Sequence, residues 1–149
     1  MVKLVDIKKA LITLLNEVKP DLKIFSEDIE QIETIGESAF PLLFIQLVPL
    51  SKSVELNGKN CNRLILVDIT FMEKSKSSNE SMYEMAELVM GRIGIGFNVG
   101  DRFLKVLNIG SSIADDTLHI TFNLDFFDDM DIKEPETEVY ESISFKVLK

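Results

Sequence analysis

Apolar and polar residues alternate through positions 116–127, DTLHITFNLDFF, and this is the clearest pattern in the chain. Successive side chains of a β-strand point to opposite faces, so the alternation predicts a half-buried strand with one apolar and one polar face. The apolar face consists of Leu118, Ile120, Phe122, Leu124 and Phe126. We expect this strand to form a main wall of the core.

Two further stretches predict the strands of a long hairpin. Residues 40–50, FPLLFIQLVPL, are almost continuously apolar, which is typical of a strand covered on both faces. In residues 62–73 apolar side chains alternate again, and the other face is partly apolar too. Between them, Asn57 and Gly58 favour a two-residue type I′ turn, in which both residues have positive φ. Strands of about 15 residues would each reach roughly 50 Å, so the hairpin either bends or projects; a flexible loop at 51–60 is the alternative.

Two stretches have the period of an amphipathic helix. In residues 5–18 the apolar stripe, which Pro20 ends, consists of Ile7, Leu11, Leu14 and Val18. Asn79 is a suitable N-cap for a second helix. Its apolar stripe consists of Met82, Ala86, Val89 and Ile93, with Met85 beside them. The remaining expected elements are short strands at 22–25 and 102–109, a loop at 26–38, and turns at 97–101 and 110–115.

Charge divides the chain of 149 residues unevenly. Of the net charge of −9, residues 125–141 carry −7, from eight acids and one base, which leaves −2 for the rest. A composition of 46% hydrophobic and 28% charged residues is typical of one globular domain. Apart from residues 125–141 the chain is therefore nearly neutral. We expect a single domain at 1–130 and an acidic C-terminal extension at 131–149, in which the pattern at 139–148 allows a final strand.

The same composition argues against several classes of protein. No apolar run approaches the roughly 20 residues that span a bilayer, and polar residues interrupt the N-terminal run, so neither a membrane span nor a signal peptide is expected. The only arginines are Arg63, Arg92 and Arg102; without a basic footprint, direct nucleic-acid binding is not expected. The single Cys61 excludes an internal disulfide and a cysteine-based zinc site, and suits a reducing cytosol.

Three patterns suggest chemistry, and each has a simpler explanation. Glycines at 91, 94 and 96 close a helix, whereas a dinucleotide-binding loop opens one. His119, the only histidine, lies on the polar face of its strand, where a solvated or interface role is favoured over catalysis. Asp128, Asp129 and Asp131 lack the glycine and distal glutamate of a calcium loop, which favours a solvated acidic linker. We expect no catalytic residue, no cofactor and no metal.

The order of these patterns resembles a known family. The stretches FPLLFIQLVPL, NRLILVDITFME, NESMYEMAELVMGRI and DTLHITFNLDFF follow one another as in small tail terminator proteins of long-tailed phages. The resemblance covers most of residues 2–127 and is strongest to such proteins of PBSX-like prophages and contractile bacteriocins. It implies an α/β fold of the α+β kind, with a mixed, mainly antiparallel sheet that contains a long hairpin and is flanked by two main helices.

What the resemblance implies is a structural role and no enzyme activity. Such a protein forms a hexameric ring on the finished tail tube, ends polymerisation of tube and sheath, and offers a surface for head joining. The implied partners are other copies of the chain, the tail tube protein, the sheath protein and a head–tail connector. The implied location is the bacterial cytoplasm during assembly and then the head-proximal end of the tail.

Within this hypothesis, the hairpin tip at 51–60 and the turn at 94–102 make contacts in the ring or with the tube. The candidate contact residues are Val54, Leu56, Asn57, Gly58, Arg92, Phe97 and Arg102. A strand at 139–148 would also be able to extend the sheet of a neighbouring copy. Two alternatives stay open: another head–tail joining protein, and a small acidic adaptor or inhibitor that binds a basic partner through residues 125–141.

Overall fold

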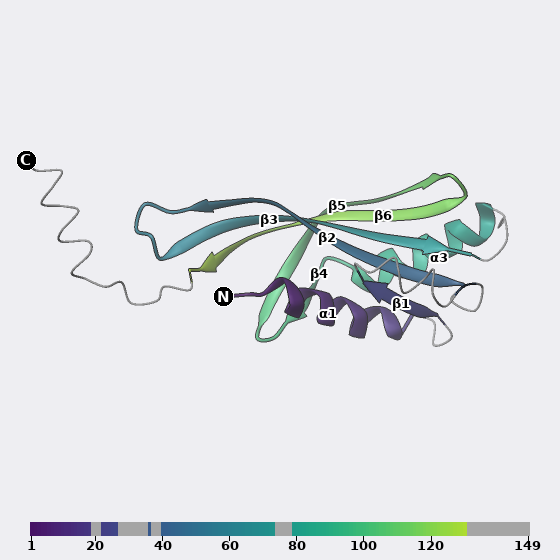
Figure 1. Cartoon of the computed structure of the whole chain (residues 1–149), viewed down its shortest axis with the longest axis horizontal. Coiled ribbons are helices and arrows are strands. Elements are labelled where there is room, and N and C mark those ends of the chain that lie inside the picture. The colour runs from purple at the N-terminus through teal and green to yellow at the C-terminus, as the bar shows by residue number, and fades with distance from the viewer. Residues whose placement is uncertain (19–21, 27–35, 37–39, 74–78, 131–149) are drawn as a thin grey trace, which may run out of the picture.

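The computed structural model describes residues 1–18, 22–26, 36, 40–73 and 79–130. Within them, two helices cover one face of a six-stranded sheet (Figure 1). In chain order the elements are α1 (Leu4–Asn16), β1 (Lys23–Ser26), β2 (Leu42–Val54), β3 (Asn60–Met72), α3 (Asn79–Ile93), β4 (Gly96–Val99), β5 (Arg102–Ala114) and β6 (Thr117–Asp129). This is an α+β fold, as predicted. The acidic extension and its final strand lie outside the described residues, as do most of the loop at 26–38 and the residues between β3 and α3.

The sheet is mixed and mostly antiparallel. Its strand order is β1-β2-β3-β6-β5-β4, in which only β1 and β2 run parallel. The predicted wall of the core is β6, and every apolar residue of its alternating set is buried. Full burial of one large apolar side chain contributes about 1.5–3 kcal/mol. The core therefore depends strongly on β6 and on β3, its neighbour at the centre of the sheet.

The hairpin strands change character along their length. At the start of β2, residues Leu42–Ile45 are buried on both faces, as the continuous apolar run predicted. Beyond Val48 every residue of β2 is exposed. Along β3, the odd-numbered residues from Cys61 to Phe71 are all buried, and those from Ile65 onward belong to the core that the helices cover, which confirms the predicted alternation. One end of the hairpin thus belongs to the core and the other end leaves it.

The helices bury one stripe each. On α3 the buried residues are those predicted: Met82, Met85, Ala86, Val89 and Ile93. On α1 the prediction was partly wrong, since Leu15 is fully buried while Leu14 is only partly covered. The spacing of Ile7, Leu11 and Leu15 is four residues throughout, and α1 ends at Asn16, before Val18. The helix therefore faces the sheet along a narrower stripe than the sequence suggested.

The β2–β3 turn differs from the predicted type I′ turn. Gly58 has a positive φ of 69°, whereas Asn57 does not. The turn is wider: the Glu55 N–H donates to the Asn60 carbonyl at 2.8 Å and the Gly58 N–H to the Glu55 carbonyl at 2.9 Å. The Asn57 side-chain oxygen accepts the backbone N–H of Lys59 at 2.8 Å. Because asparagine completes the turn with its side chain, it does not need the left-handed backbone.

The type I′ geometry occurs instead between β5 and β6. Ala114 pairs with Thr117, and the two residues between them, Asp115 and Asp116, have φ of 51° and 58°. β5 was predicted to end before a turn at 110–115, but it continues through Gly110 to Ala114. The start of β5, Arg102–Lys105, pairs with β4, and from Val106 onward the strand pairs with β6, with a register shift between Leu107 and Gly110.

Gly96 begins β4 at a point where two strands approach closely. A Cβ atom there would lie 2.3 Å from the Leu104 carbonyl oxygen and 2.6 Å from Cζ of Phe103. Real Cβ atoms do not approach backbone oxygens so closely, so only glycine fits without a shift of β5. The glycine marks the packing of β4 on β5, rather than only the end of a helix.

We expect Gly96→Ala to lower the free energy of unfolding by about 2 kcal/mol, because the added methyl group overpacks the strand pair. Urea denaturation measures the change. Gly110→Ala is the matched control, since no atom lies within 4 Å of the added Cβ, and its effect should be below about 0.5 kcal/mol. A Gly96→Ala variant as stable as the wild type would contradict this assignment.

Candidate assembly surface

The outer ends of β2, β3 and β6 leave the helix-covered part of the sheet together. We call this structure the arm: residues 49–64 and 125–130. In Figure 1 it projects past the N-terminus of α1. The ladder between β2 and β3 extends to Val54 opposite Cys61, and β6 follows β3 as far as Asn60 opposite Asp129. The predicted projecting hairpin is therefore present, and its tip is a paired structure rather than a loose loop.

One buried carboxylate fixes the root of the arm. The side chain of Asp128 is only 2% exposed. One of its oxygens accepts hydrogen bonds from the Val2 N–H at 2.9 Å and from Arg63 at 3.0 Å. The other accepts from Arg102 at 3.0 Å and from the Asp129 N–H at 2.9 Å. A single side chain thus joins the N-terminal segment, β3, β5 and β6.

The two arginines make further contacts that hold this cluster together. Arg63 also donates to the Val2 carbonyl, and Arg102 donates to the Phe127 carbonyl at 2.5 Å. Their guanidinium carbons lie 5.4 Å and 5.5 Å from the ring centroid of Phe126, which is within cation–π range. We call Val2, Arg63, Arg102, Phe126 and Asp128 the Asp128 cluster. Asp128 is therefore no part of a solvated linker, contrary to the sequence-based expectation.

The environment of Asp128 holds its carboxyl group in the ionised form. Burial by itself raises the pKa of a carboxyl group, because it removes the charge from water. Hydrogen bonds from the Val2 N–H, from Arg63 and from the Asp129 N–H outweigh burial and leave the pKa of Asp128 below its ordinary value. The cluster therefore contributes to stability as an ionised group.

The arm ends in a tip, residues 51–60, that exposes apolar side chains. Val54 is 53% exposed and Leu56 projects fully into solvent. Asn57 and Gly58 form the turn between the strands. Next to the tip, Phe127 on β6 is 64% exposed. The structure thus brings together four of the seven candidate contact residues, on a support that the Asp128 cluster fixes.

A comparison with known families decides what kind of protein carries this arm. The family model of phage tail terminator proteins matches residues 6–138, which is most of the chain. The chain belongs to the phage tail terminator family. Its role is structural, and its place is in the tail of a virion. No curated protein matches the chain. Among solved structures, one protein with 12% sequence identity matches with a TM-score of 0.48, over 89% of this chain and 99% of that protein.

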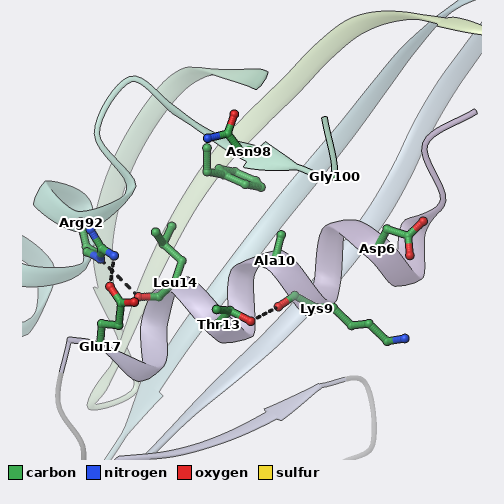
Figure 2. A pocket seen from close by; sticks show the side chains of 10 residues that line it. Asp6, Lys9, Ala10, Thr13, Leu14, Glu17, Arg92, Asn98 and Gly100 are labelled. Carbon is green, nitrogen blue, oxygen red and sulfur yellow. Dashed lines mark hydrogen bonds and ion pairs between the residues drawn. The ribbon is translucent and has the colours of Figure 1, made fainter. Parts of the chain in front are cut away.

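In this tail terminator, Arg92 joins the two helices instead of standing free. Its guanidinium donates to the Glu17 carboxylate, and its Nε lies 3.4 Å from the Leu14 carbonyl oxygen. Figure 2 shows these contacts at one end of a pocket of about 530 Å³ between α1 and β4. Glu17 and Arg92 are both well exposed, so this ion pair adds little to stability.

Phe97 and Arg102 also have places within the tail terminator fold. Phe97 is buried and packs edge-to-face on Phe122, with ring centroids 6.3 Å apart. It therefore belongs to the hydrophobic core. Arg102 belongs to the Asp128 cluster, although 38% of its side chain stays exposed. Phe97 thus packs β4 onto the core, and Arg102 links the start of β5 to the arm.

His119 has partners, which the sequence did not reveal. Its Nδ1 lies 3.2 Å from the Thr70 hydroxyl and 3.3 Å from an Asp68 carboxylate oxygen. Both contacts use the same ring nitrogen, whereas a catalytic triad uses one nitrogen for the acid and the other for the nucleophile. The arrangement is a cross-strand polar contact between β3 and β6.

The described residues also bear on metal binding and on membrane insertion. No group of three or more His, Cys, Asp or Glu side chains there is arranged to hold a metal ion. Neither described helix has the length and apolar character needed to cross a membrane.

Replacing Asp128 with Asn should lower the free energy of unfolding at neutral pH by about 3 kcal/mol, because Arg63 loses its buried counter-charge. A lowered pKa stabilises the fold above the ordinary carboxyl value of about 4, and this contribution is lost as the pH falls through the lowered value. The difference between wild type and variant should therefore shrink towards about pH 3. Urea denaturation between about pH 7 and about pH 3 measures both effects.

Asp125→Asn is the matched control for this prediction, because Asp125 is an exposed acid on the same strand. It should change the free energy of unfolding by less than about 0.5 kcal/mol. If the loss in Asp128→Asn were the same at both ends of the pH range, the ionised carboxylate would not be the source of the stability.

Proposed function

We propose that this tail terminator forms a ring of identical copies, six in number, on the end of the tail tube. The ring ends polymerisation of the tube and of the sheath, and its outer surface joins the head through a connector. Assembly takes place in the bacterial cytoplasm, and the ring then stays at the head-proximal end of the tail. The observation that supports this proposal most strongly is the arm with its exposed apolar tip.

The tip has the composition of a surface that becomes covered. Leu50, Val54, Leu56 and Phe127 are each more than half exposed and lie on the arm, with Phe127 on the opposite face from Val54. Large apolar side chains that gather on one exposed surface mark interaction sites in soluble proteins. Because Asp128 and its arginines fix the arm, little conformational freedom is lost when the tip binds. A fixed apolar projection therefore suits repeated assembly.

Charge is compatible with self-association. Outside residues 125–141 the chain carries a net charge of only −2. Within that segment, the carboxylate of Asp128 is balanced by Arg63 and Arg102. The body of the domain, residues 1–124, carries −4, so copies that pack through it meet only moderate long-range repulsion.

The double variant Val54→Ser, Leu56→Ser tests the role of the tip. It should fold with an unchanged urea midpoint, because both side chains are exposed. In a prophage that lacks the wild-type gene, it should give tails of uncontrolled length by negative-stain microscopy, while the wild-type gene restores uniform tails. Val5→Ser, an equally exposed residue on α1, is the control and should restore them as well. Uniform tails with the double variant would refute the proposed role of the tip.

A further inference from the structure

A second exposed surface with apolar residues lies on α3. The residues Glu80, Tyr83, Glu84, Glu87 and Leu88 follow the spacing i, i+3, i+4, i+7 and i+8, which places them on one side of the helix. All five are exposed; Tyr83 is 59% and Leu88 52% exposed. No ion pair to the three glutamates occurs within the described residues. We call this surface the α3 outer face.

The α3 outer face and the arm tip have complementary chemistry. The face presents two large apolar side chains among three carboxylates. The tip presents Val54 and Leu56 between the exposed lysines Lys52 and Lys59, and with the exposed Glu55 the charge of residues 51–60 is +1. Apolar side chains at the centre of a contact, with opposite charges around them, are typical of protein–protein interfaces.

The two surfaces do not meet within one chain. In Figure 1 the arm tip and the start of α3 lie towards opposite ends of the molecule. The β3 strand between them has 13 residues and spans about 40 Å. Within the described residues, the tip and the α3 outer face of one copy therefore do not contact each other. When two copies join through one tip and one α3 outer face, the pair still presents one tip and one α3 outer face for further contacts.

We propose that the arm tip of one copy packs on the α3 outer face of the next copy. The contact is heterologous, since it joins two different surfaces, and contacts of this kind build rings when the rotation from one copy to the next closes. The inference rests on the proposed ring and specifies the surfaces that build it. Val54 and Leu56 lie against Tyr83 and Leu88, while Lys52 and Lys59 face the glutamates of α3.

Charge reversal tests this pairing. The tip variant carries Lys52→Glu and Lys59→Glu; the helix variant carries Glu84→Lys and Glu87→Lys. Each variant alone places like charges together at every contact and should lower the yield of uniform tails at least about tenfold. A control with Lys9→Glu and Lys105→Glu, exposed lysines elsewhere, should behave as the wild type.

Coexpression of the two variants gives the decisive result. In a ring where they alternate, each reversed tip meets a reversed helix and each unchanged tip meets an unchanged helix. Uniform tails should therefore return to within about twofold of the wild-type yield, as they should with the chain that carries all four substitutions.

Failure of coexpression to restore uniform tails, with both variants folded, would overturn the pairing and would assign these surfaces to another tail protein. Single variants that still give uniform tails would also overturn it, while the proposed function would stand. The proposed function itself would fail if the wild-type chain did not control tail length.

Discussion

The arm depends on the burial of one charge, that of Asp128. A carboxylate removed from water is costly unless charged and hydrogen-bonding partners surround it. Arg63, Arg102 and the Val2 N–H provide these partners from separate parts of the chain. Every one of those parts must therefore be in place before the carboxylate is satisfied. This requirement fixes the positions of β3, β5 and β6 relative to one another at the root of the arm.

The position of the arm determines what the rest of the surface is able to do. Because the strands are paired almost to the turn, the apolar tip stands at a fixed distance from the helices. A flexible loop with the same residues would lose conformational freedom on binding. The α3 outer face lies on the opposite part of the fold, so the proposed contact joins two different surfaces of neighbouring copies. His119, by contrast, makes its polar contacts with Thr70 and Asp68 within the sheet.

Much of this fold could be predicted from local patterns, because β6, β3 and α3 each bury a periodic set of residues. Asp128 was predicted wrongly, as part of a solvated linker, although the alternation of β6 extends to it. It occupies the next inward position after Phe126 in the alternation of β6. Only its acidic neighbours in the sequence indicated that its side chain would be exposed to solvent. The turns and the length of β5 depend on side-chain hydrogen bonds and on a bulge, which periodicity does not report. Phe97 and Arg92 were predicted as contact residues. Their partners within the chain come from distant parts of the sequence, which leave no local signal.

The most direct test of this account is electron cryomicroscopy of the head-proximal end of isolated tails. The account predicts a closed ring of this protein on the last layer of the tube, with the arm tip of each copy in density against α3 of its neighbour. Tail ends without the protein, or copies whose arms touch no other copy, would contradict it.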